Sequence, residues 1–292
     1  MCSGVGTARA AACCGTGYGV GGRLAPAERA AVTMQASGTV PYGSMNADGR
    51  FVRARSVSLE GRPELSGMVR LWRGLQAGLA FRGVTQVRGL PRKRAVGTGI
   101  GDVRAFGRYE LVPSGGSGWV PGFALTASLT LPTGRAPWAG RDPAGADVTG
   151  TGLASLRVGV ALEHALGEDF FWAAGGTVGL SQPAANAGGF RVEHAPQLQV
   201  FAAGGPTLRR TLSLAAGLHY QREGAPLING RLAPGADRSK AALFGVASWE
   251  FGERWNLVVT AQADLPYDRT GRNDELTAAV TGGLRCIVGA WE

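Results

Sequence analysis

The sequence predicts an all-β protein, and three observations lead to this fold class. Apolar and polar residues alternate with a period of two through long segments. The connections between these segments alternate between short and long, and aromatic residues gather near the segment ends. A period of two places successive side chains on opposite faces of a strand, whereas helical periodicity is weak along the whole chain.

The clearest alternation lies in residues 119–132, where Leu125 and Leu129 on one face alternate with Thr126 and Thr130 on the other. Similar patterns recur along the chain, and each one indicates a strand with one apolar and one polar face. We therefore expect about twelve strands, at 30–43, 55–72, 75–86, 99–113, 119–132, 151–165, 170–182, 191–204, 208–222, 240–251, 255–267 and 274–288.

The connections between these strands indicate how the sheet is closed. Short connections at 73–74, 114–118, 166–169, 205–207 and 252–254 alternate with long ones at 44–54, 87–98, 133–150, 183–190, 223–239 and 268–273. This alternation is typical of outer-membrane barrels, which have short periplasmic turns and longer extracellular loops. Residues 30–292 are therefore predicted to form a single antiparallel up-and-down transmembrane β-barrel in a bacterial outer membrane, and we expect a monomer.

The composition agrees with this class and excludes others. No apolar run approaches the ~18 residues that a membrane helix needs. The net charge is +9, but the arginines are scattered through Gly- and Pro-rich connections rather than clustered. Nucleic-acid binding, which requires a clustered basic surface, is therefore not expected. The expected partners are membrane lipid, anionic lipopolysaccharide at the outer connections, and a small-molecule solute.

The polar face of the strands is predicted to line the barrel lumen. Acidic and basic residues are nearly balanced there, so they either brace the wall as ion pairs or form a polar permeation path. The predicted lumen-facing residues are Glu60, Arg62, Glu64, Arg70, Arg82, Asp102, Arg104, Arg108, Glu110, Arg157, Glu163, Arg191, Glu193, Arg209, Asp264 and Arg285.

The aromatic residues near the strand ends are predicted to form two belts at the level of the lipid headgroups, as in other membrane barrels. One belt lies near the long loops and the other near the short turns. The predicted belt residues are Tyr42, Tyr109, Trp119, Trp172, Tyr220, Trp249, Trp255 and Tyr267.

Residues 1–29 are predicted to be a disordered N-terminal segment. The stretch TARAAACC (7–14) resembles the end of a signal peptide, or a lipid-attachment site at Cys13, but the apolar core of a signal is missing. Either the segment is a remnant of a signal whose start lies upstream, or the chain is not exported, and the strand pattern of the rest of the chain favours the first. The roles of Cys13 and Cys14 stay open, and no cysteine has the spacing of a metal site.

An enzyme is not expected. The three histidines, His164, His194 and His219, fall on three different predicted strands, and the sequence contains no nucleophile motif of the GxSxG type. No nucleotide-binding or calcium-binding motif is present either. The sequence therefore predicts no catalytic residue, no metal site and no cofactor.

Two groups of motifs carry a resemblance to a known family. The strand 119–132 ends in Leu131-Pro132-Thr133-Gly134, and after a loop Gly150-Thr151-Gly152 opens the next strand. The Gly-rich segment GTGIGDVRAFGRYEL (97–111) precedes both. These motifs resemble outer-membrane β-barrel transporters of the MetA-pathway of phenol degradation family. The resemblance implies a channel-like barrel associated by name with uptake of hydrophobic aromatic compounds, and it brings no catalytic residue.

The function expected from the residues is passive or facilitated passage of small molecules, which the resemblance extends to hydrophobic or aromatic ones. One alternative is a plugged barrel with a structural or adhesive role and no transport. A second is a soluble, lipocalin-like ligand-binding barrel, which requires an apolar interior.

Overall fold

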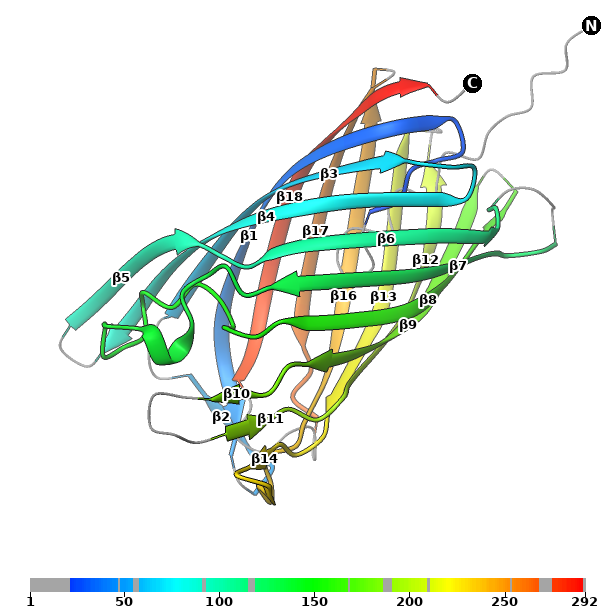
Figure 1. Cartoon of the computed structure of the whole chain (residues 1–292). Coiled ribbons are helices and arrows are strands. Elements are labelled where there is room, and N and C mark those ends of the chain that lie inside the picture. Colours follow the sequence, from blue (N-terminus) through cyan, green and yellow to red (C-terminus); the bar gives the residue numbers. More distant parts are fainter. Residues whose placement is uncertain are drawn as a thin grey trace, which may run out of the picture.

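The computed structural model describes residues 22–46, 48–54, 58–90, 93–114, 119–167, 169–185, 191–208, 211–252, 254–267 and 275–290. Figure 1 shows these residues as one closed, tilted barrel with a small group of short strands beyond one rim. The strand order is β18-β17-β16-β13-β12-β9-β8-β7-β6-β4-β3-β1, and β18 pairs again with β1. Twelve strands thus form a closed antiparallel wall, as the sequence predicts.

Each predicted strand corresponds to one wall strand. The wall strands are β1 (Glu28–Met45), β3 (Ser58–Arg70), β4 (Leu75–Leu90), β6 (Val103–Val112), β7 (Gly122–Leu131), β8 (Ser155–Leu166), β9 (Phe170–Ser181), β12 (Gln197–Leu208), β13 (Leu212–Glu223), β16 (Arg238–Phe251), β17 (Trp255–Asp264) and β18 (Glu275–Ala290). No helix among the described residues is long and apolar enough to cross a membrane.

The seam between the first and last strands closes the barrel. Glu28 of β1 is paired with Ala290 of β18, and the ladder continues to Ser44 and Glu275. We call the end at which β1 begins and β18 ends the turn end, because the tight turn 71–74 between β3 and β4 lies there. The opposite end is the loop end. Closure leaves no strand edge of the wall exposed to lipid, which has no hydrogen-bonding partner to offer.

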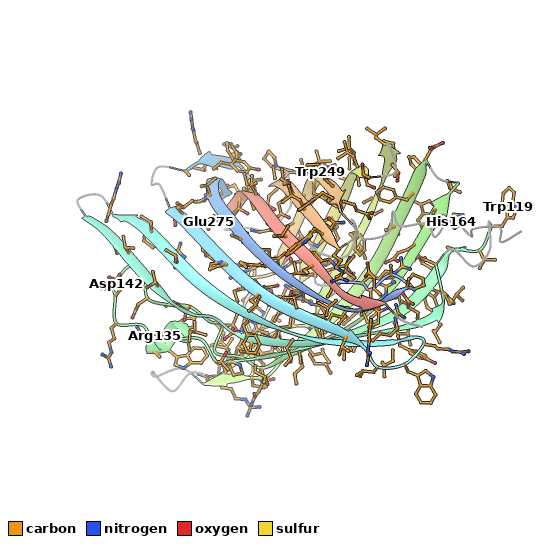
Figure 2. All side chains as sticks on the ribbon, turned by 90° about the horizontal axis from the view of Figure 1, so that it is seen from above. Trp119, Arg135, Asp142, His164, Trp249 and Glu275 are labelled. Atoms are coloured by element: carbon orange, nitrogen blue, oxygen red, sulfur yellow. The ribbon has the colours of Figure 1, made fainter. Side chains whose placement is uncertain are left out.

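The two faces of the wall have opposite character. Leu125, Leu129 and Leu131 of β7 are exposed on the outside, whereas Thr126 and Ser128 are buried on the inside. The same order holds around the barrel, and Figure 2 shows side chains crowding its interior. A lipocalin-like barrel would have its apolar residues inside, so this alternative is excluded by the arrangement. An exterior of leucine, valine and phenylalanine suits lipid rather than water.

The structure corrects one predicted loop. Residues 87–98 are expected to be a long connection, but β4 continues to Leu90 and pairs with β5 (Lys93–Ile100). At Gly101 and Asp102 the chain leaves β5 and enters β6, and the exposed positions change from even to odd numbers. This break in phase explains why the alternation fails there, although both sides of the break are extended.

A second correction concerns residues 191–204. The wall strand β12 begins only at Gln197, and residues 191–193 form β11, which belongs to a separate sheet of β10 (Ala184–Ala185), β11 (Arg191–Glu193), β14 (Leu227–Ile228) and β15 (Arg231–Leu232). This sheet joins two connections at the loop end (Figure 1). Arg191 and Glu193 are therefore outside the wall, because their strand pairs with a loop instead of a neighbouring wall strand.

The predicted disordered segment 1–29 is corrected at its end. Residues 22–27 are ordered inside the barrel, and Glu28 and Arg29 already belong to β1. Residues 1–21, with Cys13 and Cys14, lie outside the described residues.

A charge on the outer surface of the wall tests the lipid-facing assignment. Val259 lies midway along β17 and is exposed. Val259→Arg should lower the free energy of unfolding in bilayers by about 2–4 kcal/mol, because arginine is poorly tolerated at the membrane midplane. Urea unfolding in lipid vesicles measures this. Leu232→Arg, in the exposed strand β15 outside the wall, is the matched control and should stay within about 0.5 kcal/mol of the parent. Equal effects of the two changes would contradict the assignment.

Candidate functional site

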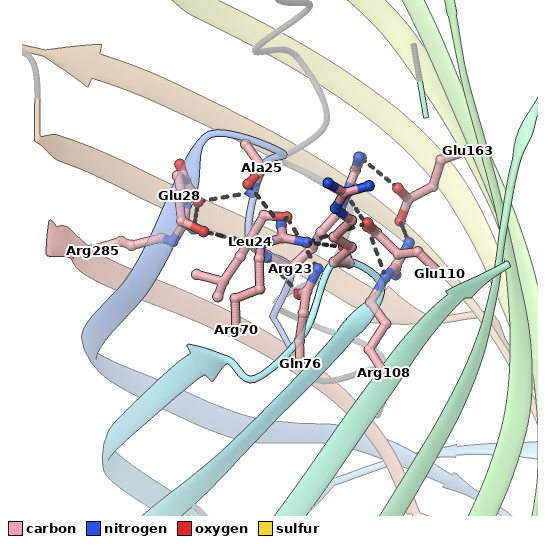
Figure 3. A network of polar contacts seen from close by, with 11 residues as sticks. Arg23, Leu24, Ala25, Glu28, Arg70, Gln76, Arg108, Glu110, Glu163 and Arg285 are labelled. Atoms are coloured by element: carbon pink, nitrogen blue, oxygen red, sulfur yellow. Dashed lines mark hydrogen bonds and ion pairs between the residues drawn. The ribbon is translucent and has the colours of Figure 1, made fainter. Parts of the chain in front are cut away.

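The N-terminal segment 22–27 occupies the lumen near the turn end. Figure 3 shows it surrounded by side chains that come from strands on several sides of the wall. Arg23 and Leu24 are buried, and Leu24 is completely inaccessible to solvent. Because β1 begins at Glu28, the segment can only reach this position by turning inward from the rim.

Arg23 joins this segment to strands β6 and β8 by ion pairs. Its Nε donates to Glu110 of β6 at 3.2 Å, and its Nη1 donates to Glu163 of β8 at 2.6 Å. The Arg108 Nη2 forms an ion pair with the other oxygen of Glu163 at 3.0 Å. These side chains are nearly fully buried, so water screens the attraction between their opposite charges only weakly.

The backbone of the segment is bonded by side chains of the wall. Gln76 accepts a hydrogen bond from the Leu24 N–H at 2.8 Å and donates one to the Leu24 carbonyl at 3.3 Å. Arg70 donates to the carbonyls of Leu24 and Ala25 at 3.0 and 2.8 Å. Arg285 of β18 donates to the Arg23 carbonyl at 2.9 Å. A buried backbone without such partners would be costly, so the wall is adapted to this segment.

The side chain of Leu24 fills the apolar part of the same seat. It packs in one buried cluster with Ala31, Met68, Ala80 and Phe106, which belong to four wall strands. Apolar packing and ion pairing therefore hold the segment at one level of the lumen, and the segment narrows the lumen there.

The loop-end half of the lumen contains a second group of charges. Glu64 of β3 accepts hydrogen bonds from Arg82 at 2.8 and 3.1 Å and from Gln35 at 3.0 Å. Arg104 approaches the same carboxylate at 3.4 Å, and its guanidinium lies 5.7 Å from the centroid of the Phe106 ring. Glu64 is thus shared by two arginines.

Arg157 of β8 also faces the lumen in this half. Its Nη2 donates to the amide oxygen of Gln197 at 2.7 Å, and among the described residues it has no carboxylate partner. Its Nε is buried without a hydrogen bond. The local group of Arg82, Arg104, Arg157 and Glu64 therefore contains more positive than negative side chains.

The loop between β7 and β8 is fastened at the loop end by Asp102. The Asp102 carboxylate accepts hydrogen bonds from the Gly134 N–H at 3.0 Å, the Thr151 N–H at 2.8 Å and the Thr151 hydroxyl at 3.0 Å. The Thr133 hydroxyl donates to the Gly101 carbonyl and accepts from the Val103 N–H. Asp102 joins the two ends of the loop to the break between β5 and β6.

Two glycines of this loop are required by close backbone contact. A Cβ on Gly134 would lie 2.7 Å from the Gly150 Cα, and a Cβ on Gly150 would lie 2.4 Å from an Asp102 oxygen. Farther along, Gln86 donates to the Val148 carbonyl at 2.9 Å. Since Gln86 is on the inner face of β4, residues near Val148 lie across the inside of the β4–β5 hairpin. The motifs 131–134, 150–152 and 97–111 thus meet in one place.

The structure brings many of the predicted lumen residues together and separates others. Arg70, Arg108, Glu110, Glu163 and Arg285 surround the N-terminal segment, and Glu64, Arg82 and Arg104 form the second group. Asp264 pairs with Lys240 at 3.6 Å and accepts from Thr277. Glu60 and Arg62 pair with each other. Asp102 accepts hydrogen bonds from the loop between β7 and β8. Arg191 pairs with Glu193 in β11, and Arg209 lies outside the described residues.

The predicted belt residues lie near strand ends in the structure. Trp119 is exposed just before β7, and Figure 2 places it at the opposite end from Arg135 and Asp142. The Trp172 ring lies 6.0 Å from that of His164 across β8 and β9. The Tyr42 hydroxyl donates to the carbonyl of Asp264. Exposed aromatic side chains also occur at Tyr109, Tyr220, Trp249, Trp255 and Tyr267. Their position relative to lipid stays a prediction.

Sequence reasoning misses Arg23, Leu24 and Gln76. Arg23 and Leu24 precede the first strand and show no periodicity, so nothing local indicates burial. Gln76 reads as one polar residue among many on an inner face. Their common role depends on β3, β4, β6, β8 and β18 meeting around one segment, which no local pattern reveals.

Comparison with known proteins gives structural matches only. The sequence matches no protein-family model and no curated protein. The COG4313 outer membrane channel from Pseudomonas putida F1 is similar in structure, with a TM-score of 0.74 and 16% identity, over 91% of this chain and 97% of that chain. The NanC porin has a TM-score of 0.51 and 10% identity, over 87% of this chain and 100% of its own. The KdgM porin has a TM-score of 0.50 and 7% identity, over 88% and 99%.

These structures are outer-membrane channels and porins rather than enzymes. Together with the apolar exterior and the closed wall, they identify the fold of this chain as that of an integral outer-membrane β-barrel. At these identities the likeness concerns the fold, and the transported solute is a separate question.

The role of Asp102 can be tested on the loop itself. Asp102→Ala removes the acceptor of three hydrogen bonds, and a donor that is left unpaired costs about 1–3 kcal/mol where it is buried. We expect faster tryptic cleavage after Arg135 and Arg141 in the folded barrel. Asp237→Ala is the control, because Asp237 shows no hydrogen bond within the described residues. Unchanged cleavage of the Asp102→Ala variant would show that Asp102 does not fasten the loop.

Proposed function

We propose that this barrel is an outer-membrane channel for passive or facilitated passage of small molecules, with hydrophobic or aromatic compounds as candidate solutes. The observation that carries the proposal is the polar lumen inside a closed twelve-stranded wall. Ion pairs hold charged side chains against the lumen wall at both levels, and the pair of Arg23 with Glu163 is the more buried one. The solute class rests on the resemblance of the loop motifs.

The segment 22–27 favours a second candidate, the plugged barrel without transport. Its backbone and side chains are bonded on all sides at the turn end. In the channel proposal, this segment is a constriction that moves or leaves a narrow path. In the plugged barrel, the lumen never opens, and the function depends on the outer surface.

The outer connections suit contact with anionic lipopolysaccharide, as part of the same proposal. Arg135, Arg141 and Arg231 are exposed in loop-end connections, and Arg238 is exposed at the loop-end start of β16. Exposed arginines bind phosphate well because the guanidinium can form two parallel hydrogen bonds. We also propose that the barrel works as a monomer and without catalysis.

Single-channel recording in planar bilayers separates the two candidates. The barrel should give discrete conductance steps, and Arg23→Ala should give larger or more frequent ones, because the segment loses both ion pairs to the far wall. Arg62→Ala is the control, since Arg62 pairs with Glu60 away from the segment and is half-exposed. Heat-modifiable migration on gels verifies folding of each variant. If neither parent nor Arg23→Ala conducts while both are folded, the channel proposal fails and the plugged barrel is favoured.

A further inference from the structure

We propose that the loop-end half of the lumen holds a binding site for a small organic carboxylate with an apolar body, centred on Arg157. This inference deepens the proposed function by naming a class of solute for the same lumen. It rests on four features: two arginines that are not fully neutralised, a buried hydroxyl without a partner among the described residues, two glycines over which large side chains lie, and an aromatic ring nearby.

The first feature is the pair Arg104 and Arg157. On the intervening strand β7, Thr130 is paired with Arg104 and Ser128 with Arg157, two residues apart on the inner face. The two arginines thus start from neighbouring positions on the inner face of the wall. Glu64 is the only carboxylate that contacts either of them within the described residues, and it is already bonded to Arg82 and Gln35. An anion bound at Arg157 would offset the positive charge that Glu64 leaves unbalanced.

The second feature lies on β9. Thr177 faces the lumen and is 4% exposed, and its hydroxyl has no hydrogen-bond partner within the described part of the chain. Buried hydroxyl groups in native proteins usually have a partner, so an orphan one calls for a ligand or a water. Its methyl group is accommodated by Gly159, where a Cβ would lie 2.5 Å from the Thr177 Cγ2.

Glycines on either side of Thr177 make room for the side chains of Arg157 and Phe201 to lie over β9. Gly179 is paired with Arg157, and a Cβ there would lie 3.5 Å from the Arg157 Nε. A Cβ on Gly175 would lie 2.7 Å from the ring of Phe201. The inner face of β9 therefore presents, in order, the guanidinium of Arg157, the hydroxyl of Thr177 and the ring of Phe201.

The spacing of these groups selects the ligand. Two residues along a strand span about 7 Å, so the hydroxyl of Thr177 and the ring of Phe201 are about one aromatic ring apart. A carboxylate can accept from Arg157 and Thr177 together, as charge-assisted hydrogen bonds require, while its apolar body lies along Phe201. Phe201 itself packs against the buried apolar cluster of Phe171, Ala203 and Phe244, so this side of the lumen is apolar.

The charges around the N-terminal segment are less suited to bind an added anion. Arg23, Arg70 and Arg285 there are bonded to carboxylates and to backbone carbonyls. Glu110 and Glu163 add two buried negative charges at that level. Arg157, on the loop-end side of the constriction, differs from these arginines because it contacts no carboxylate within the described residues.

Isothermal titration calorimetry with benzoate and benzyl alcohol on the detergent-folded barrel tests the site. Benzoate should bind, and benzyl alcohol, which has the same ring without the charge, should bind at least tenfold more weakly. Arg157→Gln should weaken benzoate binding about tenfold or more and leave benzyl alcohol unchanged, because it removes only a charged partner. Thr177→Val, which keeps the shape, should weaken it severalfold. Arg191→Gln, in β11 outside the wall, is the matched control and should bind as the parent does.

Acetate and inorganic phosphate complete the design. Benzoate should bind more tightly than acetate, and equal affinities would overturn the contact with Phe201. Phosphate that competes as well as benzoate would overturn the carboxylate specificity. No benzoate binding to the parent, or binding that Arg157→Gln leaves intact, would overturn the site as a whole. Calorimetry needs no open path through the lumen. A barrel that conducts but does not bind benzoate therefore contradicts this inference alone, and one that binds but never conducts contradicts the channel alone.

Discussion

The structure depends first on closure of the backbone hydrogen-bond ladder. In the hydrocarbon core no solvent can bond a free N–H or carbonyl, so β1 must pair with β18 and every strand between them with two neighbours. Closure then forces the side chains into two sets, because successive residues point to opposite sides of the wall. The outer set, such as Leu125 and Leu129, must suit lipid, and the polar residues can only be placed inside.

A polar interior of limited width creates a second requirement, which is to satisfy the charges it contains. At the turn end the chain meets this requirement with its own N-terminal segment, whose Arg23 bonds to Glu110 and Glu163. At the loop end the requirement is met only in part, since Arg157 has an amide as its partner. The lumen is thus polar at two levels: at the turn end the arginines are paired with carboxylates of the chain, and at the loop end Arg157 is bonded to an amide.

The sequence predicts the wall well because the apolar and polar residues of each membrane strand alternate with a period of two. The alternation fails at Gly101 and Asp102, where the phase changes, so the hairpin of β4 and β5 is mistaken for a loop. Arg191 follows the alternation but pairs with a connection instead of the wall. The inward position of Arg23, and the use of Asp102 to hold Gly134 and Thr151, depend on residues far apart in the chain. Periodicity carries no information on such contacts.

The contact between Arg285 and the Arg23 carbonyl has a consequence for the order of assembly. Arg285 belongs to β18, the last strand, and it also pairs with Glu28 at the start of β1. The pocket for the N-terminal segment therefore does not exist until the first and last strands have met. The hydrogen bond between the segment and β18 can therefore form only after the barrel has closed, so docking of the segment follows closure.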